Sequence, residues 1–499
     1  MRAKIVTERI HFMIADKNTM KKTETASGFK SQELMEKAGL ACAEKIRQDF
    51  PDAENVLILA GKGNNGGDGL VMARILKEKN CRVYLVEGNV KTPEAKHAYR
   101  LLSRTMFIKK EEIEQSIRKA DLIVDAVYGF SYHGNLNPEV RKLFLMVNHA
   151  GVPVVSIDIN SGCECDSGYC DVDAIHSEVT YALDCRKPFH AMRRNHRMCE
   201  RVETLSLDLP HTVPSSITEM NEDIFFQNFP KKPENAYKGT YGKTLLVGGS
   251  YGMAGAISMN IIGAKTIGAG YINVALPEEI YPIVASHHIT PVFHPLGHNT
   301  MLDVLRPLIS GARTIAFGSG AVNMDHKNDV LDLILQNSEA PIVLDAEALN
   351  LLHQNTYILR LVHEPVIVTP HVGEFSRMIS QPVEAIHDHA LEYAQRFARN
   401  YHTYVVLKQP STIVASPDGR IYINESGNQA LAQAGSGDLL TGILAGMLTM
   451  TSDVWKAICM AVWLHGYLAD LGIQKHAIQN FRIESYPEIM DELFHKHGY

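Results

Sequence analysis

The chain has 499 residues, more than a single hydrophobic core usually contains, so we expect at least two domains. Hydrophobic residues make up 45% of it and charged residues 21%, which excludes a disordered, collagenous or coiled-coil protein. The formal net charge of -7 excludes the basic surface that general binding to nucleic acids or anionic membranes requires. We therefore expect small-molecule partners, no nucleic acid and no membrane.

The N-terminal stretch 1–20 carries charges throughout and contains no apolar core of signal-peptide length, so we expect a cytoplasmic protein. The most apolar long stretch, 430–450, is interrupted by Gln433 and Asp438 and predicts a buried helix instead of a membrane span.

The 8 cysteines are too few for a disulfide framework in a chain of this length. Cys163, Cys165 and Cys170 lie close together in the sequence, which leaves a zinc site as an alternative. No fourth ligand stands at a familiar spacing, so reduced, partly buried thiols are the favoured interpretation.

Short runs rich in Val, Ile and Leu alternate with helix-length segments in both halves of the chain. The predicted strands are 55–60, 82–86, 121–127 and 152–159 in the first half and 244–247, 271–276, 314–317, 342–344, 366–369 and 404–407 in the second. Both halves therefore predict an α/β fold with largely parallel sheets. The segment 209–234 has four prolines and no sustained periodicity, so we place the boundary inside it, with domains at 1–215 and 222–499.

A glycine-rich motif, GKGNNGGDG at 61–69, follows the first strand and precedes a predicted helix at 70–79. Glycines let the backbone approach an anion and adopt conformations closed to other residues, and a helix N-terminus presents unpaired amides. A purely structural loop is the alternative. Asp125 and Asp158 end later strands, and the carboxyl ends of parallel strands converge on one crevice. Carboxylates in that crevice could bind a cation or move a proton.

These residues, together with LMEKAG at 34–39 and IDINSG at 157–162, resemble the YjeF N-terminal family, the NAD(P)H-hydrate epimerase domain. The resemblance covers roughly residues 15–210 and implies a Rossmann-like three-layer αβα domain that interconverts the R and S hydrates of NADH and NADPH. It implies a hydrate site formed by Asn64, Asn65, Gly66, Gly67, Asp68, Gly129, Phe130, Ser131, Tyr132, His133, Gly134, Asn135 and Asp158.

The same resemblance implies a potassium ion held by Asn65, Asp125 and Ser161. Our hypothesis is that Asp158 relays the proton during epimerisation, and the alternative is an Asp that only caps a loop. Two positions depart from the family pattern. Asn160 stands where the family usually has Pro, and Ser131 stands where it usually has Gly.

A second motif, AGSGD at 434–438, opens the predicted apolar helix 439–450. Its glycines and the helix N-terminus can form an anion hole, and Asp438 can take a proton from an attacking hydroxyl during phosphoryl transfer. Lys408 and Thr412 follow the strand YVVLK, and Asp345 and the segment TPHVGE follow two other strands. All of these positions lie at predicted carboxyl ends, the ligand side of an α/β sheet.

Roughly residues 225–495 resemble the ADP- or ATP-dependent NAD(P)H-hydrate dehydratase, a member of the ribokinase-like superfamily, through KGTYG at 238–242, GGS at 248–250, DAEALN at 345–350 and AGSGD. The resemblance implies a ribokinase-like αβα domain in which the hydrate contacts Ala256, Gly320, His371 and Asp438. It implies that the nucleotide contacts Lys408, Gln409, Pro410, Ser411, Thr412 and Gly437, with Mg²⁺ as cofactor.

In the implied reaction, phosphorylation of the hydrate hydroxyl is followed by loss of phosphate, giving AMP and phosphate if ADP is the donor. Asp438 is the predicted general base. Gln409-Pro410 and the run 318–322 depart from the family pattern and leave the strength of this second activity open.

The two halves together predict a bifunctional repair enzyme for NADHX and NADPHX, which we expect to form a homo-oligomer. The alternative is a ribokinase-like kinase of a small alcohol with a non-catalytic N-terminal binding domain, which would release a stable phosphoester. The choice between ADP and ATP, and between the two hydrates, stays open.

Overall fold

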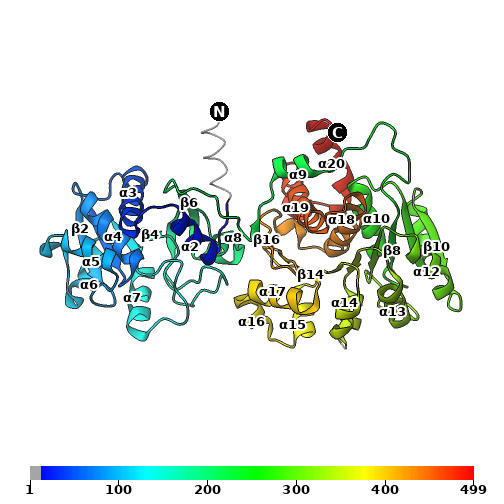
Figure 1. Cartoon of the computed structure of the whole chain (residues 1–499), viewed down its shortest axis with the longest axis horizontal. Helices are drawn as coiled ribbons and strands as arrows, with labels where there is room; N and C mark the ends of the chain where they lie inside the picture. The colour runs from blue at the N-terminus through cyan, green and yellow to red at the C-terminus, as the bar shows by residue number, and fades with distance from the viewer. Residues whose placement is uncertain (1–12, 354) are drawn as a thin grey trace. The chain divides into compact units, whose positions relative to one another are not determined.

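The computed structural model describes residues 13–353 and 355–499. Residues 1–12, which belong to the charged N-terminal stretch considered above, and residue 354 lie outside the described residues. The chain divides into two compact units between Glu219 and Met220, within the proline-rich segment 209–234. In Figure 1 the first unit runs from blue to green and the second from green to red.

The first unit is built on a six-stranded sheet in the order β2-β1-β3-β4-β5-β6, with every pair parallel. The strands are β1 (Asn55–Ala60), β2 (Asn80–Leu85), β3 (Leu122–Ala126), β4 (Val154–Ile157), β5 (Ser177–Leu183) and β6 (Cys199–Leu205). The four predicted strands are confirmed with small shifts at their ends. β5 and β6 were not predicted, because Ser, Glu, Thr and Arg side chains interrupt their apolar runs.

Helices cover both faces of this sheet. Side chains alternate along β1, so that Val56, Ile58 and Ala60 face one layer while Leu57 and Leu59 face the other. The first layer contains α3 (Ser31–Asp49), α4 (Asn64–Ile75) and α5 (Pro93–Arg100), the second contains α6 (Ile113–Lys119) and α7 (Pro138–Asn148), and the unit also has α2 (Lys17–Ala26) and α8 (Pro188–Ala191). The predicted three-layer αβα architecture is confirmed.

The glycine-rich motif differs from its prediction, because α4 begins at Asn64 and its first turns contain the glycines. None of the glycines between residues 61 and 69 has a positive φ, so the expectation of left-handed backbone was wrong. A Cβ at Gly66 would lie 2.0 Å from the carbonyl oxygen of Gly61, and one at Gly69 would lie 2.7 Å from the Cβ of Ala126. The glycines therefore allow α4 to pack closely on the strand ends beside it.

The second unit is also built on a mostly parallel sheet. Its strands follow the order β10-β9-β8-β11-β12-β13-β14-β15-β16, parallel from β10 to β14 and antiparallel from β14 to β16. They are β8 (Thr244–Val247), β9 (Ile272–Pro277), β10 (Val292–Leu296), β11 (Thr314–Phe317), β12 (Ile342–Leu344), β13 (Val366–Val368), β14 (Tyr404–Leu407), β15 (Ile413–Ala415) and β16 (Ile421–Ile423), while β7 covers Ile217–Thr218. The six predicted strands are confirmed.

One group of helices packs over Leu246, Ala316, Val343 and Ile367, which share one face of this sheet. This group consists of α10, α18, α19 and α20, which lie together in Figure 1. The helices of the unit are α9 (Glu222–Asn228), α10 (Ala254–Thr266), α11 (Tyr281–His287), α12 (Met301–Ser310), α13 (Lys327–Asn337), α14 (Glu347–Leu352), α15 (Val372–Ile379), α16 (Val383–Asp388), α17 (Ala390–Tyr401), α18 (Ser436–Met450), α19 (Val454–Gly472) and α20 (Tyr486–Lys496). Within the described ranges, none of the helices combines the length and the apolar character needed to cross a membrane.

Two glycines let α10 and α18 meet at their backbones. A Cβ at Gly442 would lie 2.1 Å from the carbonyl oxygen of Asn260, and one at Gly263 would lie 2.2 Å from that of Leu439. This contact sets the position of the first turn of α18, which contains the AGSGD motif.

We expect Gly442→Ala to lower the free energy of unfolding of the second unit by about 1–3 kcal/mol, because the added methyl group must push the two helices apart. Thermal unfolding with a probe of the second unit measures this. Gly255→Ala is the matched control, since a Cβ at Gly255 in α10 meets no atom within 4 Å. Equal transition temperatures for the two variants would contradict the prediction.

Candidate functional site

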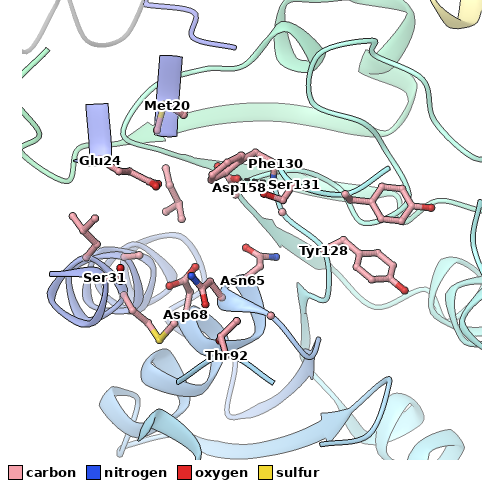
Figure 2. Close-up of a pocket in the computed structure, with 18 of the residues that line it drawn as sticks. Met20, Glu24, Ser31, Asn65, Asp68, Thr92, Tyr128, Phe130, Ser131 and Asp158 are labelled. Carbon is pink, nitrogen blue, oxygen red and sulfur yellow. Dashed lines mark hydrogen bonds between the residues drawn. The ribbon is translucent and has the colours of Figure 1, made fainter. Parts of the chain in front are cut away.

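A cavity of about 750 Å³ lies in the first unit, where the carboxyl ends of β1, β3 and β4 meet. Its wall comes from α2, from the N-terminal parts of α3 and α4, and from the segments that follow β3 and β4. Figure 2 shows Glu24, Asn65, Asp68, Tyr128 and Asp158 around it. The segments that topology brings together at this edge are those in which the sequence placed its first group of candidate residues.

Most of the residues predicted to bind the hydrate reach the cavity wall. These are Asn64, Asn65, Asp68, Gly129, Phe130, Ser131, Tyr132 and Asp158. Gly66 and Gly67 do not line it, because they are buried inside the packing of α4. His133, Gly134 and Asn135 do not line it either, and the amide of Gly134 instead donates to Glu164 at 2.9 Å.

Asp158 is held in place by a buried ion pair. It follows β4 with a positive φ of 67° and is only 3% exposed. Its carboxylate accepts from the amide of Phe130 at 3.1 Å and from the ammonium of Lys187, which also donates to the carbonyl of Leu183 at 2.7 Å. Burial alone would lower the pKa of Lys187, but the attraction of Asp158 outweighs it and the pKa is raised.

The sequence analysis missed Lys187. The available signal was its position four residues after the end of β5, at the same sheet edge as Asp158. Because β5 was not predicted, Lys187 could not be placed at this edge of the sheet.

Beneath the cavity, the structure brings Asp125 and Ser161 together. Asp125 is fully buried and accepts from the amide and hydroxyl of Ser161 and from the hydroxyl of Ser156, the last at 2.9 Å. Burial raises the pKa of Asp125, and the hydrogen bonds from Ser161 and Ser156 offset part of the rise. Among the described residues, no cationic side chain pairs with this carboxylate.

Asn65 lies next to this group. Its side-chain oxygen is 3.2 Å from the place a Cβ would occupy on Gly129, and its Nδ2 is buried without a hydrogen-bond partner. The amide of Tyr128, the neighbour of Gly129, donates to the hydroxyl of Ser161 at 2.8 Å. One short segment after β3 therefore connects all three of the residues predicted to bind potassium.

In the second unit, Asp438 stands in the first turn of α18, after the left-handed Gly435 with φ 88°. Its side chain hydrogen-bonds to Ser319. Burial and, next, the charge of Asp345 raise the pKa of Asp438 to about 6. Asn260 donates to the carbonyl of Asp438 at 2.7 Å and to the hydroxyl of Ser319 at 3.0 Å, so α10 fixes this turn.

A buried network surrounds Asp345 at the end of β12. Asp345 accepts from Lys408 at 2.7 Å, from Thr369 at 2.8 Å and from Thr441 at 2.9 Å. The ammonium of Lys408 also lies 3.2 Å from the position of a Cβ on Gly437. Lys408 thus reaches the AGSGD turn, while its ion pair is with Asp345. Thr441 was not singled out by the sequence.

The other predicted positions of this unit fall near the same strand ends. A Cβ on Gly320 would lie 2.8 Å from the Cβ of Ala256. His371 caps α15, its Nδ1 accepting from the amides of Gly373 and Glu374, and its backbone pairs with Lys408. Gln409, Pro410, Ser411 and Thr412 form the connection between β14 and β15. His465, which the sequence analysis missed, lies with its Nε2 3.3 Å from the hydroxyl of Ser436.

The zinc alternative finds no support among residues 13–353 and 355–499, where no group of three or more His, Cys, Asp or Glu side chains is placed to hold a metal ion. All of the cysteines are free and buried, including Cys163, Cys165 and Cys170. The interpretation as buried thiols is confirmed.

We expect Lys187→Met to destabilise the first unit by about 3–5 kcal/mol, because it leaves the buried carboxylate of Asp158 without a counter-charge. The measurement is chemical denaturation followed in the first unit. Lys62→Met is the control: its ion pair with Glu87 has a lysine side chain that is 42% exposed, and its loss should cost less than about 1 kcal/mol. Similar losses in the two variants would count against the structural role of the Lys187–Asp158 pair.

Comparison with known families matches each unit separately. The family model described as "YjeF-related protein N-terminus" matches residues 31–189, and the one described as "NAD(P)H-hydrate dehydratase" matches residues 244–488. The chain is 30% identical over 463 residues to a bifunctional NAD(P)H-hydrate repair enzyme of Moorella thermoacetica, covering 88% of this chain and 87% of the relative. It is 30% identical over 454 residues to the enzyme of that description in Escherichia coli, covering 89% and 86%.

Solved structures resemble the second unit. A ribokinase-like superfamily protein from Enterococcus faecalis has a TM-score of 0.50 at 23% identity, covering 56% of this chain and 96% of its own, which shows the ribokinase-like fold. An ADP/ATP-dependent NAD(P)H-hydrate dehydratase from Bacillus subtilis, co-crystallised with ATP/Mg²⁺, is 30% identical with a TM-score of 0.49, covering 55% and 97%.

Proposed function

The chain belongs to the family of bifunctional NAD(P)H-hydrate repair enzymes, and we propose that its two units divide that repair between them. The first unit interconverts the R and S hydrates of NADH and NADPH. The second converts the S hydrate to NADH or NADPH at the expense of ADP or ATP. The observation that carries this proposal is that each matched half places an aspartate, Asp158 or Asp438, at the carboxyl edge of its parallel sheet.

The alternative, a small-alcohol kinase with a non-catalytic N-terminal domain, is not favoured. The relatives from Moorella thermoacetica and Escherichia coli are similar across both units, and both are bifunctional NAD(P)H-hydrate repair enzymes. A non-catalytic N-terminal domain would also have no need for the buried Asp158–Lys187 pair at the wall of a cavity.

In the first unit, the substrate carries a hydroxyl on carbon six of the reduced ring, next to the ring nitrogen. Inversion at carbon six requires one bond to break and form again, which needs a positioned acid or base. Asp158 supplies proton transfer at the cavity wall, held in position by Lys187 and the amide of Phe130. Asn64, Asn65, Asp68 and the segment 129–132 provide the binding contacts in this proposal.

The residues beneath this cavity fit a potassium ion. Asp125 is a buried carboxylate without a cationic partner among the described residues, and such a charge is costly unless it is compensated. Asn65, Asp125 and Ser161 supply neutral and anionic oxygens, the ligand types that hard cations prefer. A bound potassium ion would neutralise Asp125 and order the segment after β3.

In the second unit, Asp438 removes the proton of the carbon-six hydroxyl, whose oxygen then attacks the terminal phosphate of the nucleotide. The backbone amides in the first turn of α18 face the migrating phosphoryl group and stabilise its charge. Phosphate then leaves as the lone pair of the ring nitrogen forms a double bond to carbon six, and loss of a proton from carbon five restores the dihydropyridine ring and the nitrogen lone pair. Lys408, the connection 409–412 and Gly437 bind the nucleotide, while Ala256, Gly320 and His371 contact the hydrate.

Magnesium fits this unit as part of the nucleotide complex. Asp345 is occupied by Lys408 and two threonines, and Glu374 accepts from the amide of His371 at 2.8 Å. The nucleotide phosphates and water would therefore supply its ligands, and the ion would neutralise phosphate charge.

Recovery of the absorbance of reduced nicotinamide from a mixed preparation of both hydrates tests the proposal. With magnesium and either ADP or ATP, we expect complete recovery. Replacing potassium by tetramethylammonium should slow only the later phase, in which the R hydrate is consumed, because only the first unit uses the ion. If the late phase runs at the spontaneous epimerisation rate even with potassium present, the first unit is not an epimerase. Release of a stable phosphoester without recovery would support the kinase alternative.

The dehydratase rate should depend on pH through Asp438. A general base works only when ionised, and the pKa of Asp438 is raised to about 6, so kcat/KM should fall about tenfold per unit of pH below that value. Asp438→Asn should lower the rate by about 10²–10⁴-fold at every pH. Conversion of R to S hydrate by the same variant is the control and should keep its wild-type rate. An unchanged acid limb in Asp438→Asn would assign the ionisation to another group.

We further propose a cytoplasmic location, in keeping with cysteines that are all free and buried. Assembly into a homo-oligomer is part of the same proposal, and light scattering of the full chain measures it.

A further inference from the structure

Four carboxylates lie along the cavity of the first unit; Glu87 is paired with Lys62, and the other three come from three different elements. Glu24 comes from α2, Asp68 from α4, and Asp158 from the end of β4. Figure 2 shows Asp68 and Asp158 on separate walls of the cavity and Glu24 at a third place around it. Like charges in one cavity cannot all remain ionised at low cost, so their surroundings decide which of them carries a proton.

Asp158 and Asp68 have opposite surroundings. The carboxylate of Asp158 accepts from a buried lysine and a backbone amide. Asp68 is only 8% exposed, and among the described residues no donor or cation contacts its carboxyl group. Burial, and then the charges of Asp158 and Glu24, raise the pKa of Asp68 well above its ordinary value. An unpaired, buried carboxyl that faces a cavity is therefore available as a proton donor.

The two charged groups that act on the pKa of Asp68 both raise it. Asp158 and Glu24 are acidic, and the thiol of Cys42 on α3 is buried and uncharged. Lys187 is bound to Asp158. Glu24 differs from Asp68 because it is half-buried, and Lys187 and Lys21 oppose the rise of its pKa.

We propose that Asp68 is the second proton-transfer residue of the epimerase, acting across the cavity from Asp158. This inference rests on the proposed function of the first unit. Inversion at carbon six needs an acid where the hydroxyl leaves and a base where water enters, on opposite faces of the ring. Asp68 and Asp158 provide these two groups on separate walls of one cavity.

In one direction, inversion at carbon six begins with protonated Asp68. Asp68 gives its proton to the hydroxyl oxygen, the carbon–oxygen bond breaks with its electron pair on the departing water, and the lone pair of the ring nitrogen forms a double bond to carbon six. Water then attacks the opposite face, the nitrogen regains its lone pair, and Asp158 takes the proton. Asp68 ends ionised and Asp158 protonated, so the reverse reaction uses them in exchanged roles, or protons exchange with solvent to restore the start.

Lys187 is a positioning residue in this scheme, since it touches Asp158 and not the reacting carbon. Its ammonium holds the carboxylate of Asp158 in place before proton transfer. It also makes the two aspartates unequal, because among the described residues no cation contacts Asp68.

The test uses the full chain and the purified R hydrate without nucleotide, following the appearance of the S hydrate by chromatography. Wild-type protein must interconvert the hydrates; if it does not, the proposed function itself fails. Given wild-type activity, Asp68→Asn should lower kcat by about 10²-fold or more while KM changes only a few-fold. The asparagine preserves size and hydrogen bonding but cannot donate a proton.

Glu24→Gln is the matched control, because it removes a carboxyl group from the same cavity. It should lower kcat only a few-fold. Chemical denaturation followed in the first unit shows that each variant is folded. The pH profile gives a second measurement: the loss of kcat/KM at high pH, where Asp68 ionises, should disappear in Asp68→Asn.

Three results would overturn the inference. Asp68→Asn with wild-type kcat shows that no proton comes from this group. A higher KM with unchanged kcat makes Asp68 a binding residue only. A large loss of kcat in Glu24→Gln but not in Asp68→Asn moves the acid to α2.

Discussion

A lysine bound to a buried aspartate, at the carboxyl edge of a parallel sheet, organises both units. Lys187 binds Asp158 in the first unit and Lys408 binds Asp345 in the second. Burial lowers the pKa of each lysine, and the attraction of its aspartate reverses this, so that both pKa values are raised. Burying each pair costs desolvation energy, and the attraction between its two charges and the hydrogen bonds around it must offset that cost. The neighbouring groups must therefore keep these hydrogen bonds.

In each unit, the lysine-bound aspartate also raises the pKa of a second aspartate nearby. The charge of Asp158 raises the pKa of Asp68, and the charge of Asp345 raises the pKa of Asp438. In each unit a lysine-bound aspartate therefore stands beside a carboxyl group whose pKa it raises. Proton transfer at carbon six and proton removal from its hydroxyl both need such a group, so two different reactions share one electrostatic arrangement.

Glycines position these carboxyl groups, because they let helices pack closely on their neighbours. In the first unit they let α4 lie against the strand ends, which places Asp68 on the cavity wall. In the second unit Gly263 and Gly442 let α10 and α18 touch, so that Asn260 reaches the turn that contains Asp438. A helix displaced by one methyl group would move the carboxyl groups of Asp68 and Asp438 out of these positions.

The sequence by itself determined the α/β class, most strands of the two sheets, and the motifs that follow them, because apolar runs and helix starts are local patterns. It also placed Asp125, Asp158 and Asp438 at strand and helix ends, which parallel topology brings to one edge. The tertiary structure alone decided that Lys187 meets Asp158, that Lys408 meets Asp345, and that no donor or cation in the ranges 13–353 and 355–499 contacts the carboxyl group of Asp68. Ion pairs and desolvation depend on distances between segments far apart in the chain, and no local pattern encodes those distances.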